Sequence, residues 1–357
     1  MLPVTRSNEH LYAVPKFDLG KGDVKDFMNE LKGFHEQFAD CFHRSESREH
    51  FFNYMAGQFS ELERKSIEPI ALAIKDGNVR AMQRFVSTAQ WDDDNIIAKY
   101  RNCVNDDLGS PDGALIFDES GFLKPQLAAE MLQTIHEEKT LPFKYVLGDS
   151  IYGISPEFIE TVDSLPGITY LVSVPKSTLC WLKRPMTITK KYRWGGKSRT
   201  KTVLADTDSK PMAVINLARN INDYFWYRRQ VSEGTKGPIV YEFTRRQVIL
   251  SASGLPEKTV WLLIRRTLRD DCQYSFFISN APCSTRLKTL VWLSGLRWAI
   301  EQCFEETKSE LGMDHYEVRK FMGWHHHIQT CMLAHFFLWH LKIRMGKKST
   351  VHYAVAA

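Results

Sequence analysis

The first hundred residues carry apolar side chains at helical spacing. Phe27, Leu31, Phe34, Phe38 and Phe42 recur every three or four residues, which predicts an amphipathic helix over residues 23–42. Similar patterns predict further helices at 51–62, 66–76, 78–88 and 91–104. The turn at residues 76–78 is typical of a helix-turn-helix DNA reader, and equally of plain bundle packing.

Beyond residue 110 the pattern changes to an alternation of strands and helices. Short apolar runs predict strands at 114–117, 145–147 and 168–174, and amphipathic segments predict helices at 125–138 and 155–164. Strands that alternate with helices form βαβ units around a parallel sheet. The expected fold class is therefore α/β, preceded by an all-helical N-terminal region.

A β-rich stretch follows, and the chain then returns to helices. Strands are predicted at 212–217, 224–231, 239–243, 247–251 and 259–266. A long helix capped by Ser284-Thr285 runs to about residue 311, and an apolar helix covers 324–345. We expect four parts, at residues 1–108, 109–174, 175–282 and 283–357.

The composition is that of an ordinary globular protein, with 43% hydrophobic and 25% charged residues. It excludes a disordered tail, a collagen-like fibre and a small disulfide scaffold. No apolar run approaches the roughly 20 residues of a membrane span, and the N-terminal residues have no apolar signal core, so we expect a cytoplasmic protein without membrane contact. The seven cysteines form no CxxC pair and are expected to be reduced thiols.

The net charge of +5 is unevenly distributed. Residues 176–247 hold 16 lysines and arginines against five acidic residues, so the rest of the chain is slightly acidic. Such a segment favours a polyanion, above all nucleic acid, although a solvated, salt-bridged β surface would have the same composition. Interleaved aromatic residues suit stacking on bases or the core of a β domain. The candidates for DNA contact in this segment are Arg193, Arg228, Arg229, Arg245 and Arg246.

Two aspartates follow short predicted strands. Asp118 comes after 114–117 and Asp149 after 145–147, at the strand ends where open α/β sheets place their sites. A right-handed crossover through 125–138 would set the two strands side by side, with both carboxylates at one edge of the sheet. The alternative for each aspartate is a helix cap or a turn.

The helix that ends near residue 311 carries further charged residues. Arg297, Glu301, Glu305 and Lys308 share one face beside an apolar stripe, so we expect them to be half-buried. They would equally form an i,i+4 ladder of ion pairs. Two aspartates and a glutamate are the hard oxygen ligands that Mg²⁺ prefers, and two such ions support phosphodiester chemistry. Arg297 and Lys308 would then contact phosphates.

Three motifs resemble those of the DDE transposases of bacterial insertion sequences: FDESGF at 117–122, LGDSIYG at 147–153, and RWAIEQCFEETKSELGMDHYEVR at 297–319. The third is similar to the family's Tyr-x₂-Arg-x₃-Glu-x₆-Lys signature, with Ser294 at the Tyr position. The resemblance implies an RNase H-like core interrupted by a β-rich insertion. It also implies a catalytic, metal-binding triad of Asp118, Asp149 and Glu301; the sequence leaves open whether Glu305 takes the place of Glu301 as a ligand.

The resemblance further implies partners and a location. The cofactor would be Mg²⁺ or Mn²⁺, as two ions, and the partners would be the double-stranded transposon ends and target DNA. A homodimer would bind them in the bacterial nucleoid. Arg297 and Lys308 would contact DNA near the cut. The implied activity is cleavage at the ends followed by transfer of the 3′-hydroxyl.

One spacing departs from the family pattern. Only 30 residues separate Asp118 from Asp149, too few for the two additional strands that the family core places between them. We therefore predict an internally shortened chain with a join at Lys124-Pro125, and an unpaired outer edge on the 114–117 strand. The alternatives to an active transposase are a truncated DNA-binding protein or inhibitor, and a stand-alone nuclease. The histidines at 325–327 predict stacking rather than a metal site, because consecutive helical residues point apart.

Overall fold

A computed structural model describes residues 21–118, 125–195, 197–234, 237–268, 272–344 and 354–356. Its N-terminal part is helical, as the periodicity predicts. It consists of α1 (Lys21–Glu36), α2 (Ser45–Gln58), α3 (Ile67–Ala73), α4 (Val79–Thr88) and α5 (Asp93–Leu108), with the 3₁₀ turn η2 (Ala39–Cys41). The helix predicted over 23–42 ends at Glu36, where Phe38 N donates to His35 O in a turn. Phe38 and Phe42 therefore enter the core from a bend and not from one continuous helix.

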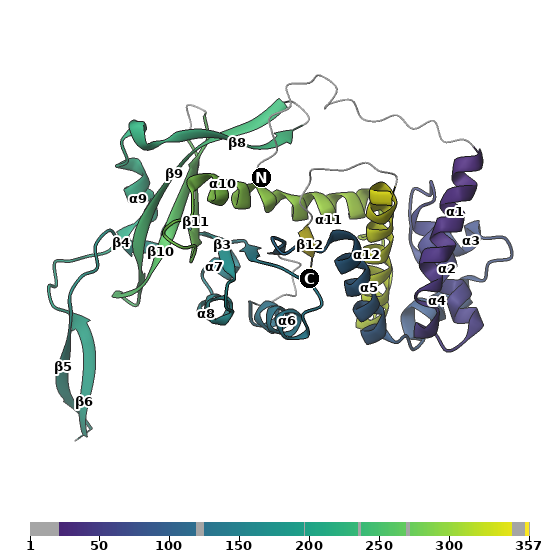
Figure 1. Ribbon diagram of the computed structural model, residues 1–357. Coiled ribbons are helices and arrows are strands. Elements are labelled where there is room, and N and C mark those ends of the chain that lie inside the picture. The colour runs from purple at the N-terminus through teal and green to yellow at the C-terminus, as the bar shows by residue number, and fades with distance from the viewer. Residues whose placement is uncertain are drawn as a thin grey trace.

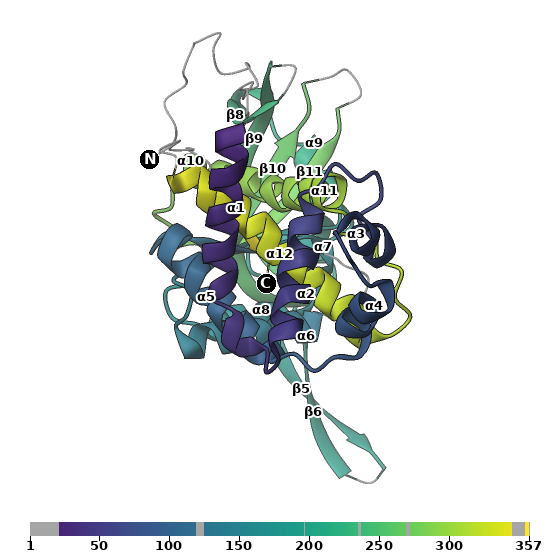
Figure 2. The same cartoon turned by 90° about the vertical axis from the view of Figure 1, so that its right-hand side faces the viewer.

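The N-terminal helices pack on the last long helix, α12 (Phe321–Arg344), as Figure 2 shows. The buried Tyr54 hydroxyl of α2 lies 2.7 Å from His327 Nδ1. His326 stacks on Trp91 with ring centroids 3.9 Å apart, and His325 stacks on Phe321. The stacking predicted for the histidine run is thus confirmed, and α12 is a central column that joins the first and last parts of the chain.

The core sheet is built from two βαβ units. The parallel strands β1 (Ala114–Phe117), β2 (Tyr145–Gly148) and β3 (Thr169–Val174) are linked through α6 (Pro125–Glu138) and through α7 (Ser150–Gly153) with α8 (Pro156–Ser164). Helices α6 and α8 cover one face of the sheet, and α10 (Leu287–Leu296) with α11 (Trp298–Leu311) covers the other (Figure 1). This α/β layering agrees with the predicted fold class.

The sheet extends through much of the β-rich stretch. β11 (Tyr274–Ser279) pairs antiparallel with β3, and β10 (Leu255–Arg266), β9 (Gly237–Ala252) and β8 (Tyr227–Gly234) follow. The short β4 (Leu179–Trp181) and β7 (Met212–Ala213) complete that end. A separate hairpin, β5 (Thr187–Trp194) with β6 (Lys197–Leu204), lies outside this sheet.

Three sequence predictions in this part are wrong in detail. The strand predicted at 212–217 ends at Ala213 and continues as the helix α9 (Val214–Arg219), whose Val214, Leu217 and Ala218 are buried at helical spacing. The strands predicted at 239–243 and 247–251 are one strand, β9, because the residues between them also pair with β10. A 3₁₀ turn, η3 (Asp223–Phe225), occupies the start of the strand predicted at 224–231.

The long helix predicted to 311 is interrupted at Arg297, between α10 and α11. Gly295 lies against β8, where a Cβ would come within 2.7 Å of Val231 Cγ1, and glycine weakens a helix interior. The expected Ser284-Thr285 cap is also absent, because α10 begins after Arg286, which makes no side-chain capping bond. Among the described helices, none is long and apolar enough to cross a bilayer.

The outer edge of β1 is paired, so the prediction of an unpaired edge is wrong. The strand β12 (Ala354–Ala356) runs parallel to β1, with Leu115 opposite Val355. The strand that pairs there is supplied by the C-terminal segment and not by the residues between the two aspartates. Of the predicted join, Lys124 lies outside the described residues, and Pro125 begins α6.

Candidate active site

The two candidate aspartates lie side by side. β1 and β2 are parallel with Phe117 opposite Gly148, so the residues that follow, Asp118 and Asp149, leave neighbouring strands at the same level. Adjacent strands are about 4.8 Å apart. The crossover through α6 thus produces the arrangement predicted from the sequence, with both residues at the carboxyl edge of the sheet.

The aspartates continue the row of side chains that faces α10 and α11. Two residues before them, Ile116 and Leu147 are buried in a core shared with Leu293 and Ile300 of those helices. Because side chains alternate along a strand, residues at this spacing share a face. Asp118 and Asp149 are both half-buried, so the site lies where the sheet, the helical layer and solvent meet.

Local packing holds the Asp149 loop in place. The Asp149 carboxylate accepts a hydrogen bond from Ile151 N at 2.9 Å and caps α7, as the alternative interpretation predicted. The fully buried Tyr152 donates its hydroxyl to the backbone oxygen of Asp118 at 3.3 Å, which links the two motifs. Gly153 packs on β3, where a Cβ would lie 1.9 Å from Ser173 O. Capping uses one carboxylate oxygen, and a carboxylate has two.

Glu301 lies at the start of α11 and forms an i,i+4 ion pair with Arg297. Their side chains are 43% and 30% exposed. The expectation of half-burial therefore holds for Arg297 but is wrong for Glu301, and also for the exposed Glu305 and Lys308. Ile300 and Leu311, on the apolar stripe of α11, are buried, whereas the charged residues lie farther round the helix and do not share that burial.

Arg265 is a cation of this region that the sequence analysis missed. It lies on β10 two residues after the buried Leu263 and therefore on the face covered by α10 and α11. Its guanidinium lies 4.6 Å from the Tyr241 ring centroid and donates to Ser275 Oγ at 3.0 Å. Burial lowers the pKa of Arg265, the Arg297 charge lowers it further, and Glu301 opposes this. The sequence signal for this residue was its spacing: Arg265 follows the apolar Leu263 by two positions in a strand, so the two side chains share a face.

The basic residues predicted to contact DNA are dispersed. Arg245 lies over the Trp261 ring at 4.2 Å and donates to Thr285 O, and Arg246 lies over Phe225 at 4.8 Å. Neighbouring β9 residues point to opposite faces, so these two arginines face different sides of the sheet. Arg228 pairs with Glu242, Arg229 lies 5.8 Å from the Tyr227 ring, and Arg193 belongs to the separate hairpin.

The comparisons with known protein families agree with the strand-end motifs. Residues 37–126 match the family described as DDE superfamily endonuclease, and residues 124–337 match the family described as Transposase DDE domain. The second match covers more than half of the chain. The chain belongs to the DDE transposase family. Membership implies transposition, DNA binding and use of a divalent metal; no curated protein matches the chain.

The aspartate pair of this transposase fits a divalent metal better than the complete triad does. Two carboxylates at the same level of adjacent strands are suitable oxygen ligands for Mg²⁺. Glu301 is engaged by Arg297 instead. Among the described residues, no group of three His, Cys, Asp or Glu side chains has the spacing of a metal site. The described conformation therefore fits a two-aspartate site and not a three-carboxylate site.

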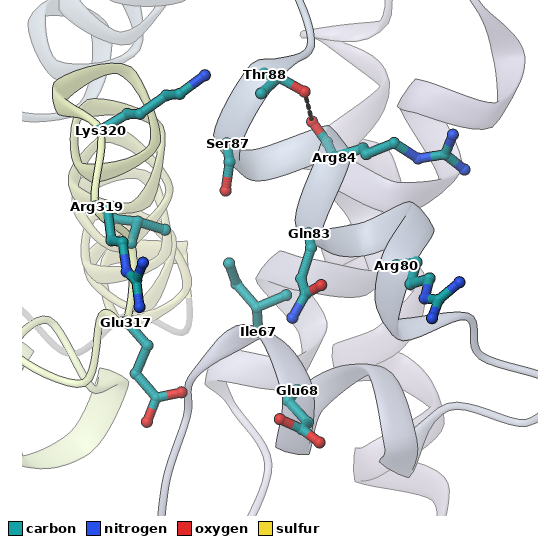
Figure 3. A pocket seen from close by; sticks show the side chains of 11 residues that line it. Ile67, Glu68, Arg80, Gln83, Arg84, Ser87, Thr88, Glu317, Arg319 and Lys320 are labelled. Atoms are coloured by element: carbon teal, nitrogen blue, oxygen red, sulfur yellow. Dashed lines mark hydrogen bonds between the residues drawn. The ribbon is translucent and has the colours of Figure 1, made fainter.

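A cleft of about 750 Å³ lies elsewhere in the transposase, between α3, α4 and residues 317–320. None of the sequence-predicted site residues lines it. In Figure 3, Gln83 and Ser87 of α4 lie opposite Arg319, and Arg80 and Arg84 of α4 also line the cleft. Helices α3 and α4 lie on either side of the 76–78 turn, as predicted. That this pair binds DNA as a helix-turn-helix stays a prediction.

Proposed function

We propose that this transposase cleaves DNA at the ends of an insertion sequence and transfers the resulting 3′-hydroxyl to target DNA. The observation that carries the proposal is the parallel register of β1 and β2, which brings Asp118 and Asp149 together at the edge of the sheet. The family match across residues 124–337 supports the same chemistry.

In this proposal Asp118 and Asp149 hold Mg²⁺ or Mn²⁺, and Glu301 becomes the third metal ligand only after it has left Arg297, with which it is paired in the structure. Bound metal supplies a Lewis acid and an activated water or 3′-hydroxyl, so the reaction needs no covalent enzyme intermediate. A DNA phosphate competes with Glu301 for Arg297, because guanidinium binds phosphate and carboxylate through the same donors. Lys308 and Arg265 supply further positive charge, and two copies of the chain pair the two DNA ends.

The experiment is Mg²⁺-dependent cleavage of a labelled duplex carrying the terminal repeat of the element that encodes this chain. Asn at position 149 retains an acceptor for the Ile151 N–H, so Asp149→Asn keeps the cap and removes the anionic ligand. Asp106→Asn, at an exposed site on α5, is the matched control. We expect Asp149→Asn to abolish cleavage and Asp106→Asn to leave it unchanged. Equal cleavage by the two variants would refute the assignment of Asp149.

A DNA-binding protein that does not cut is the second candidate. The Arg297–Glu301 ion pair favours it, as does the spacing of 30 residues between the aspartates. The two family matches also meet at residues 124–126, where the sequence predicts a join. This candidate predicts that the chain binds the labelled end without cleaving it, and that a variant with the 118–149 segment restored to family length cleaves. Cleavage without strand transfer or end specificity would instead indicate a stand-alone nuclease.

A further inference from the structure

The hairpin β5–β6 is a projecting arm. Figures 1 and 2 both show it extending away from the rest of the molecule. Its eight pairs run from Thr187 opposite Leu204 to Trp194 opposite Lys197, and every residue of β5 is exposed. At about 3.3 Å per residue, eight residues give an arm roughly 26 Å long. The arm is thus long enough to contact a partner well outside the body of the protein.

The pairing register divides the arm into two different faces. Residues that pair directly share a face, and neighbours along a strand point to opposite faces. We call one face the aromatic–basic face, and it comprises Ile188, Lys190, Tyr192, Trp194, Lys197, Arg199, Lys201 and Val203. The opposite face holds mainly threonine and serine, with Lys191 and Arg193. Four of the six cations and both aromatic side chains of the arm are therefore on one face.

The charge on the aromatic–basic face is not balanced within the protein. Residues 187–204 include no aspartate or glutamate. Lys190 lies directly opposite Lys201, and like charges in that position destabilise a strand pair. None of the ion pairs found among the described residues involves a cation of the arm. Tyr192 and Trp194 are 43% and 70% exposed. A polyanionic partner would offset this repulsion and cover the rings.

We propose that the aromatic–basic face docks into a groove of double-stranded DNA. This rests on the proposed function only in that the chain binds DNA. Two strands about 4.8 Å apart fit a major groove about 12 Å wide. Lys190 on β5, and Arg199 with Lys201 on β6, place positive charge along both margins of the ribbon. A groove has a phosphate backbone on each side, so this arrangement matches a duplex better than the single backbone of an unpaired strand.

Binding assays on the full chain test the proposal without catalysis. The Asp149→Asn protein in EDTA is titrated with a 40-base-pair duplex and, separately, with one strand of it, at several salt concentrations. Lys190→Gln with Lys201→Gln removes two charges from the aromatic–basic face. Lys191→Gln with Lys210→Gln removes two charges from the opposite face and from an exposed loop site, as the matched control. Thermal melting checks that both double variants are folded.

We expect the first double variant to bind the duplex about tenfold more weakly and to lower the slope of log K against log salt by about 1.8, as for two lost phosphate contacts. The control should change duplex affinity less than threefold. Equal losses in the two variants, or a larger loss for the single strand than for the duplex, would overturn the groove proposal and leave the proposed function standing. If the full chain with its unaltered arm binds no duplex at all, both the groove proposal and the proposed function are overturned.

Discussion

Replacing Gly153 by alanine should dislodge the loop that carries Asp149. Gly153 ends the short helix α7, and a Cβ there would lie 1.9 Å from the carbonyl oxygen of Ser173. Carbon and oxygen atoms that contact without a bond are about 3.3 Å apart or more. The backbone of α7 or of β3 must therefore move by roughly 1.4 Å, since a carbonyl oxygen has no rotamer that would relieve the overlap.

The neighbouring strands make that movement costly. β3 pairs with β2 on one side and β11 on the other, so its displacement strains two ladders. Overpacking of this kind lowers the free energy of unfolding by about 1–3 kcal/mol, and we expect about 2 kcal/mol or more. At Gly148 a Cβ would lie 3.0 Å from the Tyr152 ring, which is a much smaller overlap than the one at Gly153, so Gly148→Ala should cost about 1 kcal/mol.

Urea unfolding followed by tryptophan fluorescence measures the free energy of unfolding of Gly153→Ala and Gly148→Ala, with Gly33→Ala as the control. Gly33 is an exposed position inside α1 with no atom within 4 Å of an added Cβ, so this variant should gain about 0.5 kcal/mol. Gly153→Ala should also cleave DNA more slowly, because Asp149 is the N-cap of the displaced helix. A Gly153→Ala midpoint as high as that of Gly33→Ala would refute the packing argument.

Three further predictions concern the α12 region. Tyr54→Phe leaves His327 Nδ1 without its donor and should lower the free energy of unfolding by about 1–3 kcal/mol in urea titrations; an unchanged midpoint would exclude that bond. Burial lowers the pKa of His326 and His327 in the native state. Below pH 6.5 the unfolded chain therefore binds protons that the native state does not. The urea midpoint should fall as the pH decreases from 6.5 to 5. The pKa of His335 is raised to about 9, because its contacts with the Cys303 thiol and with the Glu306 carboxylate 3.5 Å away outweigh burial. Glu306→Gln removes one of these contacts and should lower the pKa measured by NMR titration; an unmoved titration would contradict this.

Sequence patterns were sufficient for the βαβ core and its aspartates. The segment between the aspartates has room for a right-handed helical crossover, which predicts parallel neighbouring strands with both aspartates at one edge, and the structure has that arrangement. The pairing of β12 with β1 depends on a contact between distant segments that no local pattern encodes. For Glu301 the sequence left two alternatives, a metal ligand and an i,i+4 ion pair, because helical periodicity fixes which face a residue shares but not its partner; the structure has the ion pair with Arg297. The two-faced arm required the pairing register, which composition alone does not contain.

The contacts of α12 with α2 have a consequence for how this protein reaches its native state. Tyr54 contacts His327, and Gln58 contacts Cys331, across 273 positions of the chain in each case. Contacts of such long range slow folding, because a large loop must close before they form. During synthesis, α1–α5 would therefore wait with apolar surface uncovered until α12 leaves the ribosome. We expect a fragment that ends before α12 to aggregate or to recruit chaperones, although it contains every N-terminal helix.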